Sequence, residues 1–371
     1  MNQLSYFTLS NGLSFLALNL INSFGVAFLY TRYQKSFIYS IGLLILIRVV
    51  YITLLPFFAG FIGKIGTRNS VVVSMVLMIV ANIPLYFVDH TSYLIYLWVL
   101  LMGLSFCFYF LPISLFTSKY TNSETRGIQM GKISSGIIFA SALTPLISGH
   151  VLALYSIRGF VILLTAITIT TALVFLKLDN LHFIYNKGLR NIFKFDRSLL
   201  KASWIETCHF STRNLGIFWS LYIFIFFGED YKKFGLILTA ITLFSGVLNL
   251  FVGKYLNQHN RKDILRTQVI FSPFSWIFRL LAYNAVSIFF ADAFHSLNGY
   301  IRESAVETTA YDLINRDEHK EVLDEKVVLR EILINLGIIS TMVIGVMLAS
   351  LFGLKASFYL GILISFGYLI I

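Results

Sequence analysis

Residues 59–68 read Ala59-Gly60-Phe61-Ile62-Gly63-Lys64-Ile65-Gly66-Thr67-Arg68 and join two long apolar runs of the chain. The small residues of this stretch let two helices turn sharply and approach each other closely. Its basic residues mark the side of a membrane that keeps positive charge. A second stretch of this kind joins two apolar runs in the other half of the chain and reads Gly253-Lys254-Tyr255-Leu256-Asn257-Gln258-His259-Asn260-Arg261-Lys262. Matching loops at equivalent places indicate a fold built from two similar halves.

Composition places the chain in a membrane, because hydrophobic residues make up 57% of it and charged residues only 13%. A soluble protein carries about twice that share of charge. The apolar runs reach the roughly 20 residues that a helix needs to cross a bilayer. No alternating pattern suggests membrane strands, and spanning segments must satisfy their backbone internally. We therefore expect an all-α polytopic membrane protein.

Twelve transmembrane helices are predicted, in two six-helix pseudo-symmetric halves. The halves cover residues 1–177 and 199–371, and a linker at 178–198 joins them. The predicted spans are 5–30, 37–60, 69–88, 92–117, 126–154, 157–177, 199–227, 233–253, 264–284, 286–308, 326–352 and 355–371.

Basic residues predict the orientation of these helices. Most of the 29 Lys and Arg residues fall in loops that share one side if the N-terminus is cytoplasmic, and positive charge resists translocation. Both termini are therefore expected in the cytoplasm, with the protein in a prokaryotic plasma membrane. The net charge of +11 then reflects topology, and no nucleic-acid partner is expected. Residues 1–7 show no basic region or cleavage site, so we expect no signal peptide.

Two segments between the predicted spans carry many charges. In the linker, basic residues recur every three or four positions, which favours an amphipathic helix lying on anionic lipid at the cytoplasmic face. An ordinary solvated linker is the alternative. The acidic stretch 303–325 is predicted to be a solvated cytoplasmic loop, with partner binding as the alternative.

The two glycine-rich loops resemble the paired signature of the major facilitator superfamily. Lys64, Gly66 and Arg68 match its first copy, and Gly253, Arg261 and Lys262 match its second. Gly63 and Asn257 stand where the signature has an aspartate, and Ala59 replaces its leading glycine. In the family that aspartate belongs to a charge relay that steadies one transport state, so the resemblance implies an altered relay. The candidate conformational residues are Gly60, Gly63, Lys64, Gly66, Arg68, Gly253, Arg261 and Lys262.

The fifth predicted span is also similar to a family pattern. Residues 140–149 read Ala-Ser-Ala-Leu-Thr-Pro-Leu-Ile-Ser-Gly, and Pro145 and Gly149 match that pattern outright. Small residues permit close helix packing, and proline bends a helix. In the family the pattern is commonest in exporting antiporters, so export is slightly favoured. The alternative is that Pro145 is only a structural kink.

Polar residues inside spans are costly and are therefore candidates for function. On the seventh span, Glu206, His209 and Arg213 share one face because they are three and seven residues apart. The resemblance implies that helices 1, 4, 7 and 10 line a central cavity, and polar residues gather on these helices. The candidate substrate-binding and coupling residues are Arg48, Glu206, His209, Arg213, Asp292, His295, Asn19, Asn22 and Tyr109.

The charges among these residues predict the class of substrate. Arg48 and Arg213 lie mid-span, whereas Glu206 and Asp292 are read as the only acids well inside the apolar spans. An excess of positive charge favours a carboxylate or phosphate ligand, which arginine binds with two bonds. Glu206, desolvated near His209, is a candidate proton carrier. Alternatively, a salt bridge between Glu206 and Arg213 only holds helices together.

Three further charged residues are assigned to the membrane interfaces. Arg279 is expected to extend to the interface at the outer end of its span. Arg302 and Glu303 are expected near the inner interface, where charge costs little.

Enzyme function is not expected. The chain has no nucleotide-binding Gly-x-x-x-x-Gly-Lys-Ser/Thr motif, no Gly-x-Ser-x-Gly elbow and no histidine spacing typical of a metal site. Cys107 and Cys208 lie in separate runs, so no cofactor or metal is predicted. The prediction is a monomeric secondary transporter of a small molecule that works by alternating access. A lipid flippase of the same fold and a non-transporting membrane scaffold are the alternatives.

Overall fold

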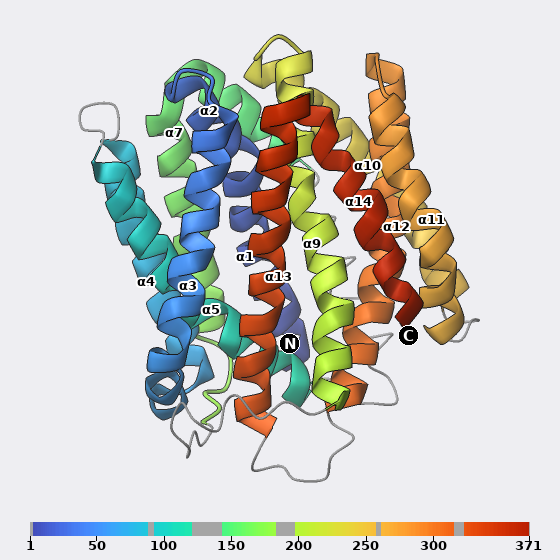
Figure 1. Ribbon diagram of the computed structural model, residues 1–371. Helices are drawn as coiled ribbons and strands as arrows, with labels where there is room; N and C mark the ends of the chain where they lie inside the picture. Colours follow the sequence, from blue (N-terminus) through green and yellow to red (C-terminus); the bar gives the residue numbers. More distant parts are fainter. Residues whose placement is uncertain are drawn as a thin grey trace.

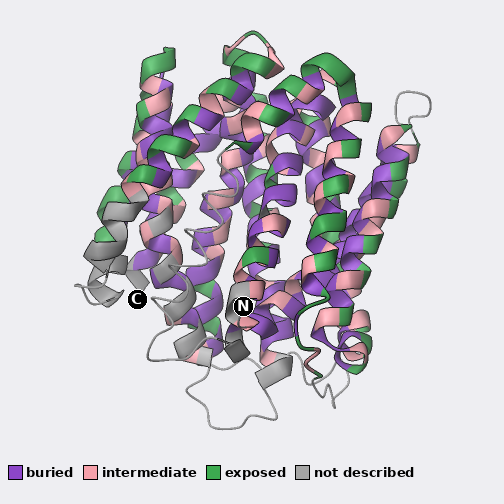
Figure 2. Cartoon of the chain, turned by 180° about the vertical axis from the view of Figure 1, so that it is seen from behind, coloured by how far each residue is buried: buried purple, intermediate pink, exposed green. Residues whose placement is uncertain are grey.

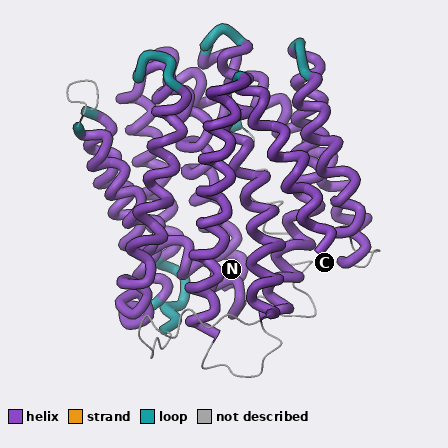
Figure 3. Tube along the Cα trace, viewed as in Figure 1, coloured by secondary structure: helices purple, strands orange, loops and turns teal. Residues whose placement is uncertain are grey.

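The computed structural model describes residues 3–87, 93–120, 143–182, 197–256, 261–314 and 323–370. These residues form a bundle of long helices without strands (Figures 1 and 3). Both chain ends lie toward the lower end of the bundle in Figure 1, which we call the terminal side. The upper end is called the far side.

Helices from the first part of the chain pack largely against one another. The first helix runs without a break through a π-helical turn, η1, between α1 and α2. The elements are α1 (Gln3–Leu20), η1 (Ile21–Gly25), α2 (Val26–Arg32), α3 (Phe37–Ile65), α4 (Thr67–Tyr86), α5 (Leu94–Tyr120) and α7 (Thr144–Phe175).

The second part of the chain continues the bundle. Its last helix descends toward the terminal side (Figure 1). The elements are α9 (Arg197–Phe226), α10 (Tyr231–Leu256), α11 (Arg261–Leu281), α12 (Ala285–Ile314), α13 (Leu323–Phe352), η2 (Leu354–Ser357), α14 (Phe358–Ser365) and η3 (Phe366–Ile370).

The described residues give eleven helices when α1, η1 and α2 count as one, rather than the twelve expected. The difference arises at Ser156, which interrupts α7 with a non-helical backbone of φ 55° and ψ −161°. A non-glycine residue in this region breaks the helical path. The sequence predicts a tight connection at this place, between the fifth and sixth spans.

Apolar surface covers the outside of the bundle, as expected for a protein surrounded by lipid. Seven of the described helices are long and apolar enough to cross a membrane. Large side chains such as Phe57, Tyr155 and Leu351 are about 70% exposed, and exposed residues lie mainly on outward faces in Figure 2. A soluble protein does not expose apolar surface on this scale. The chain is therefore an integral membrane protein.

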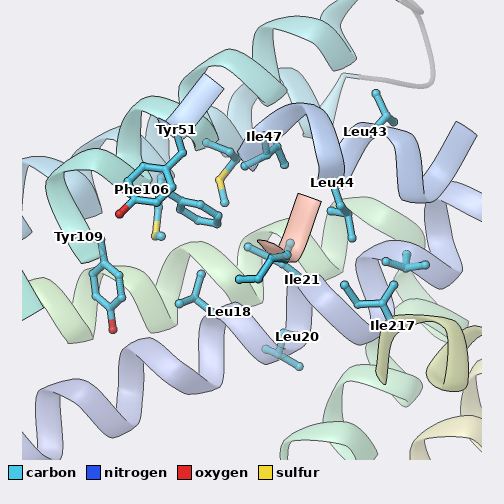
Figure 4. Close-up of a cluster of buried hydrophobic side chains, with 14 of the residues drawn as sticks. Leu18, Leu20, Ile21, Leu43, Leu44, Ile47, Tyr51, Phe106, Tyr109 and Ile217 are labelled. Carbon is cyan, nitrogen blue, oxygen red and sulfur yellow. The ribbon is translucent and has the colours of Figure 1, made fainter. Parts of the chain in front are cut away.

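The interior is filled by aliphatic and aromatic side chains from most of the helices. Figure 4 shows the part of this core where Leu18 and Leu20 of α1 meet Ile47 of α3 and Phe106 of α5. Ile217 of α9 reaches the same cluster. The core therefore joins helices from distant parts of the sequence.

The loop that decides the fold is held by a segment far along the chain. Gly66 has a φ of 88°, which side chains with a Cβ rarely adopt. The Asn180 side chain donates to the Ile65 carbonyl at 3.0 Å, and Thr67 N–H donates to the Leu181 carbonyl at 2.8 Å. The end of α3 and the start of α4 are thus fixed against residues 179–182, which follow α7.

Replacing Gly66 with leucine is expected to destabilise the protein strongly. A Cβ at this position would lie 2.3 Å from Asn180 Oδ1, and the positive φ adds backbone strain. We expect a loss of folded yield and of unfolding temperature in the purified protein. Lys64→Ala is the control because Lys64 is exposed and lies only two residues before Gly66. Equal behaviour of both variants would show that the loop is only a tether.

The structure changes what is expected of Thr67. From sequence, its position in the loop predicts that Thr67→Ala has only a mild effect on folding or transport. The residue is fully buried, and its hydroxyl accepts a bond of 3.2 Å from Leu181 N–H. Alanine would leave that donor without its partner, so this substitution is a poor control.

The two parts of the chain meet closely on the far side. Gly149 of α7 and Gly235 of α10 pack so tightly that an added Cβ on either would lie within 2.6 Å of backbone carbonyl oxygen. Thr31 and Tyr231 share a hydrogen bond of 2.9 Å, and Lys35 pairs with Glu229 at 2.9 Å. The small residue at position 149 therefore serves close helix packing.

The acidic stretch 303–325 differs from its expected structure, and some other predicted segments lie outside the described residues. The expected acidic loop is helical over its first half, because α12 continues to Ile314. Ala305, Val306 and Ala310 of this part are buried, so the helix continues to pack against the bundle. The greater part of the linker, the residues Asn257 to Asn260 and the start of the fifth span lie outside the described residues.

Candidate functional site

A cavity of about 410 Å³ lies within the bundle and is lined mainly by α1, η1, α9 and α12, with one or two residues each from α3, α5, α7, α10 and α11. This volume is typical of small-molecule sites. Seven of the nine predicted binding and coupling residues line it. They are Arg48, His209, Arg213, Asp292, His295, Asn19 and Asn22.

One wall of the cavity comes from a single face of α12. Asp292, His295, Gly299 and Arg302 line it at intervals of three or four residues, as a helix face requires. Asp292 and Arg302 are ten residues apart, which separates them by about 15 Å along the axis. Polar groups therefore follow the cavity over much of the membrane depth.

Two glycines leave room in this cavity. Gly216 of α9 and Gly299 of α12 both line it. A Cβ built on either would meet no atom within 4 Å. Their small size therefore keeps the cavity open instead of bringing helices together.

The part of the lining that α1 and η1 form combines amide and apolar groups. Asn22 and Ser23 reach the cavity from η1, and Asn19 from the last turn of α1. A π-helical turn widens a helix and is frequent at functional sites. The apolar lining residues of α1 and η1 are Leu16, Leu18, Leu20 and Phe24, and Phe110 lines the cavity from α5. The lining thus combines charged groups, mainly from α9 and α12, with amide and apolar groups from α1 and η1.

Two of its arginines are paired with carboxylates. Arg213 contacts Glu303 at 3.1 Å. Arg279 pairs with Asp292 and lies between two indole rings, with its guanidinium carbon 4.9 Å from the ring centres of Trp219 and Trp276. Aromatic faces stabilise a desolvated cation. These pairs are therefore neutralised within the protein.

The other two arginines are held only by neutral groups among the described residues. Arg48 donates to Asn335 Oδ1 at 2.6 Å and to Asn214 Oδ1 at 2.9 Å. Arg302 donates to His209 Nδ1 at 3.1 Å and to Ser272 Oγ at 2.7 Å. None of the ion pairs formed by described residues includes Arg48 or Arg302. Among the described residues, no carboxylate pairs with either guanidinium group beside the cavity.

Histidine 209 is oriented by this contact. Because Arg302 donates to Nδ1, that nitrogen must be unprotonated, which places the ring proton on Nε2. His295 has a different neighbour, since its Nδ1 lies 3.0 Å from Ser275 Oγ. The two histidines therefore occupy separate hydrogen-bonded positions on the charged wall.

Glu206 lies outside the cavity. It is fully buried, and both its oxygens accept from Arg330 of α13. The alternative salt bridge with Arg213 is therefore not formed, because Arg213 pairs with Glu303. Tyr109 also lies outside the lining, where its hydroxyl donates to Asn11 at 3.2 Å.

Three charges are placed differently from the expectation. Arg279 is only 4% exposed and does not reach the interface, because Asp292 and two tryptophans hold it inside. Arg302 is 2% exposed and belongs to the cavity. Glu206 and Asp292 are not the only acids within the spans, since Glu331 is 7% exposed in α13.

Glu331 and Arg330 have no distinctive signal in the sequence. They stand near the polar start of an apolar run, where charges are ordinarily solvated. Asn214 was detectable, because it follows Arg213 within a predicted span. Asn335 likewise falls inside a span, four residues after Glu331.

Comparison with known proteins identifies one family. The sequence model described as Major Facilitator Superfamily matches residues 4–228. No curated protein matches the chain.

Proposed function

The chain belongs to the major facilitator superfamily, whose members are secondary transporters rather than enzymes, and we propose that it carries an amphiphilic anion by alternating access. The observation that supports this most directly is the pair Arg48 and Arg302, which line the cavity without a carboxylate partner among the described residues. Buried unpaired cations are costly. An anionic ligand would neutralise them.

The proposal includes two six-helix halves, residues 1–177 and 199–371, with the terminal side in the cytoplasm. The break at Ser156 supports six helices in the first half, because it separates α7 into two segments. We further propose that the protein is a monomer in a prokaryotic plasma membrane and contacts anionic lipid at the cytoplasmic face. The basic loops and the basic composition of the linker support the orientation and the lipid contact.

An amphiphilic substrate is favoured because the wall that α1 and η1 form carries four apolar side chains, Leu16, Leu18, Leu20 and Phe24. The same wall makes a lipid or lipid-linked molecule the second candidate, moved by a flippase of this fold. The two differ in the length of the apolar part, since a membrane lipid has acyl chains that extend beyond a cavity of about 410 Å³. The proposal also includes export and proton coupling. Export is supported by the family pattern at residues 145–149, and proton coupling by the buried carboxylates.

A matched ligand series tests the charge preference. Carboxylates, phosphates and quaternary amines with the same aromatic or short alkyl body are added to purified protein in nanodiscs. We expect the anions to raise the unfolding temperature, because a ligand that binds only the folded state stabilises it. The amines should not.

Substitutions at Arg48 test whether its guanidinium group binds the anions of this series. Arg48→Ala should reduce anion affinity by roughly ten- to a hundredfold, since a charge-assisted bond contributes about 1.5–3 kcal/mol. Arg48→Lys should retain part of it, because lysine keeps the charge and loses the two-bond geometry. The matched control is Arg158→Ala, at an exposed residue outside the cavity lining. Unchanged affinity in Arg48→Ala, or stabilisation by the amines, would contradict the anion proposal.

A further inference from the structure

A buried carboxylate joins helices from the two parts of the chain. Glu331 Oε1 of α13 accepts from Ser114 Oγ of α5 at 2.7 Å. Its Oε2 accepts from the Tyr51 hydroxyl of α3 at 3.2 Å. We call Glu331, Ser114 and Tyr51 the seam. Any motion that separates α13 from α3 and α5 must break these bonds.

The seam lies toward the terminal side. Glu331 is eight residues from the start of α13, and Ser114 is six residues from the end of α5. Each is therefore about 9–12 Å from the helix end on that side. Opening the bundle toward the terminal side would expose the Glu331 carboxylate to water.

Glu331 shares its neighbouring arginine with a second buried carboxylate. Arg330 contacts Glu331 at 3.3 Å and also pairs with Glu206 of α9, so one guanidinium serves two carboxylates. Glu206 receives two bonds from it, whereas Glu331 receives one. Glu331 is therefore the less well compensated of the two.

The cavity is connected to the seam through α13 and α3. Arg48 donates to Asn335, and the Asn335 amide donates to the Glu331 carbonyl at 2.9 Å. Tyr51 follows Arg48 by three residues on the same face of α3. The charged or titratable groups that face Glu331 are Arg330 of α13, Glu206 of α9, Arg48 and Tyr51 of α3, and Cys107 of α5 beside Tyr51.

We propose that Glu331, rather than Glu206, takes up the coupling proton and that its protonation releases the seam. The proton comes from water on the terminal side and adds to a carboxylate oxygen, and no other bond forms or breaks covalently. A neutral acid accepts hydrogen bonds more weakly than a carboxylate. Lower pH therefore weakens the bonds from Ser114 and Tyr51 and favours the open seam.

Substrate enters this scheme through Arg48, and here the inference rests on the proposed function. An anion bound at Arg48 neutralises the cation that otherwise helps to balance Glu331. Glu331 then binds a proton more readily.

The test measures seam opening without substrate. Spin labels are attached at Lys64 of α3 and Arg197 of α9, which are exposed ends on the terminal side. The native Cys107 and Cys208 are buried and remain in place. Distance distributions of the full chain in nanodiscs are recorded by pulsed electron resonance as pH is lowered.

In the unsubstituted protein we expect the ratio of open to closed seam to rise by roughly tenfold on acidification, the difference between charged and neutral hydrogen bonds. In Glu331→Gln, the ratio of open to closed seam should equal, at every pH, the ratio that the unsubstituted protein shows at low pH. Tyr51→Phe should keep the response but shift its midpoint to higher pH, because the carboxylate loses a donor. Glu206→Gln should keep the response.

Three results would overturn the inference: no pH response in the unsubstituted protein, a normal response in Glu331→Gln, or a response abolished by Glu206→Gln alone. Since no ligand is present, each of these leaves the anion proposal standing. Conversely, a normal pH response with unchanged anion affinity in Arg48→Ala would refute the anion proposal alone.

Discussion

Filling the cavity from its glycines is expected to abolish transport while the protein remains folded. Gly299→Leu and Gly216→Leu each place a side chain in open space. Leucine favours a helix over glycine by roughly 0.5–1 kcal/mol, so stability should not fall. We expect at least a tenfold loss of flux for each variant and a larger loss for the pair, measured in proteoliposomes at equal protein content.

The control for these variants is Gly42→Leu. Gly42 lies in α3, where an added Cβ also meets no atom within 4 Å, and it does not line the cavity. Its flux should match that of the unsubstituted protein. If Gly42→Leu and Gly299→Leu lose flux equally, helix flexibility rather than cavity space limits transport.

The second large effect concerns the pair Arg330 and Glu206. Arg330→Met removes the cation from Glu206, which is fully buried. Breaking one member of a buried ion pair costs roughly 3–5 kcal/mol, because a charge is left uncompensated. We expect a marked fall in unfolding temperature, measured on purified protein in detergent.

A double variant separates this cost from lost packing. Glu206→Leu combined with Arg330→Met should recover the part of the stability lost through Glu206, since apolar residues of similar volume often replace a buried pair without loss. Glu331, which Arg330 also contacts, keeps its hydrogen bonds from Ser114 and Tyr51 in this variant. Lys35→Met, which removes an exposed ion pair, should have little effect. A double variant as unstable as Arg330→Met would mean that the pair itself, and not the orphaned charge, is what the fold requires.

Much of the helical architecture could be predicted because apolar runs of spanning length directly indicate membrane helices. The α3 start at Phe37 and the α12 start at Ala285 fall within a residue of the predicted span limits. Polar residues spaced by three or four positions predicted the cavity faces of α9 and α12. Such local periodicity needs no knowledge of distant contacts.

Pairings across the bundle could not be predicted, because they depend on contacts between distant residues. Nothing near Glu206 in sequence indicates Arg330, which lies 124 residues away. Gly66 was recognised as a turn residue, but its packing against Asn180 depends on where α7 ends. Arg279 was misplaced because its position near a helix end suggested solvent, whereas two tryptophans enclose it.

Transport of an anion through the arginine-lined cavity is tested most directly by flux in proteoliposomes. The carboxylate or phosphate that most raises the unfolding temperature is supplied at matched concentration with a quaternary amine of the same body, under an imposed pH gradient. The account predicts accumulation of the anion that requires the gradient and is lost in Gly299→Leu, with no accumulation of the amine. Accumulation of the amine, or anion accumulation in Gly299→Leu equal to that in the unsubstituted protein, would contradict it.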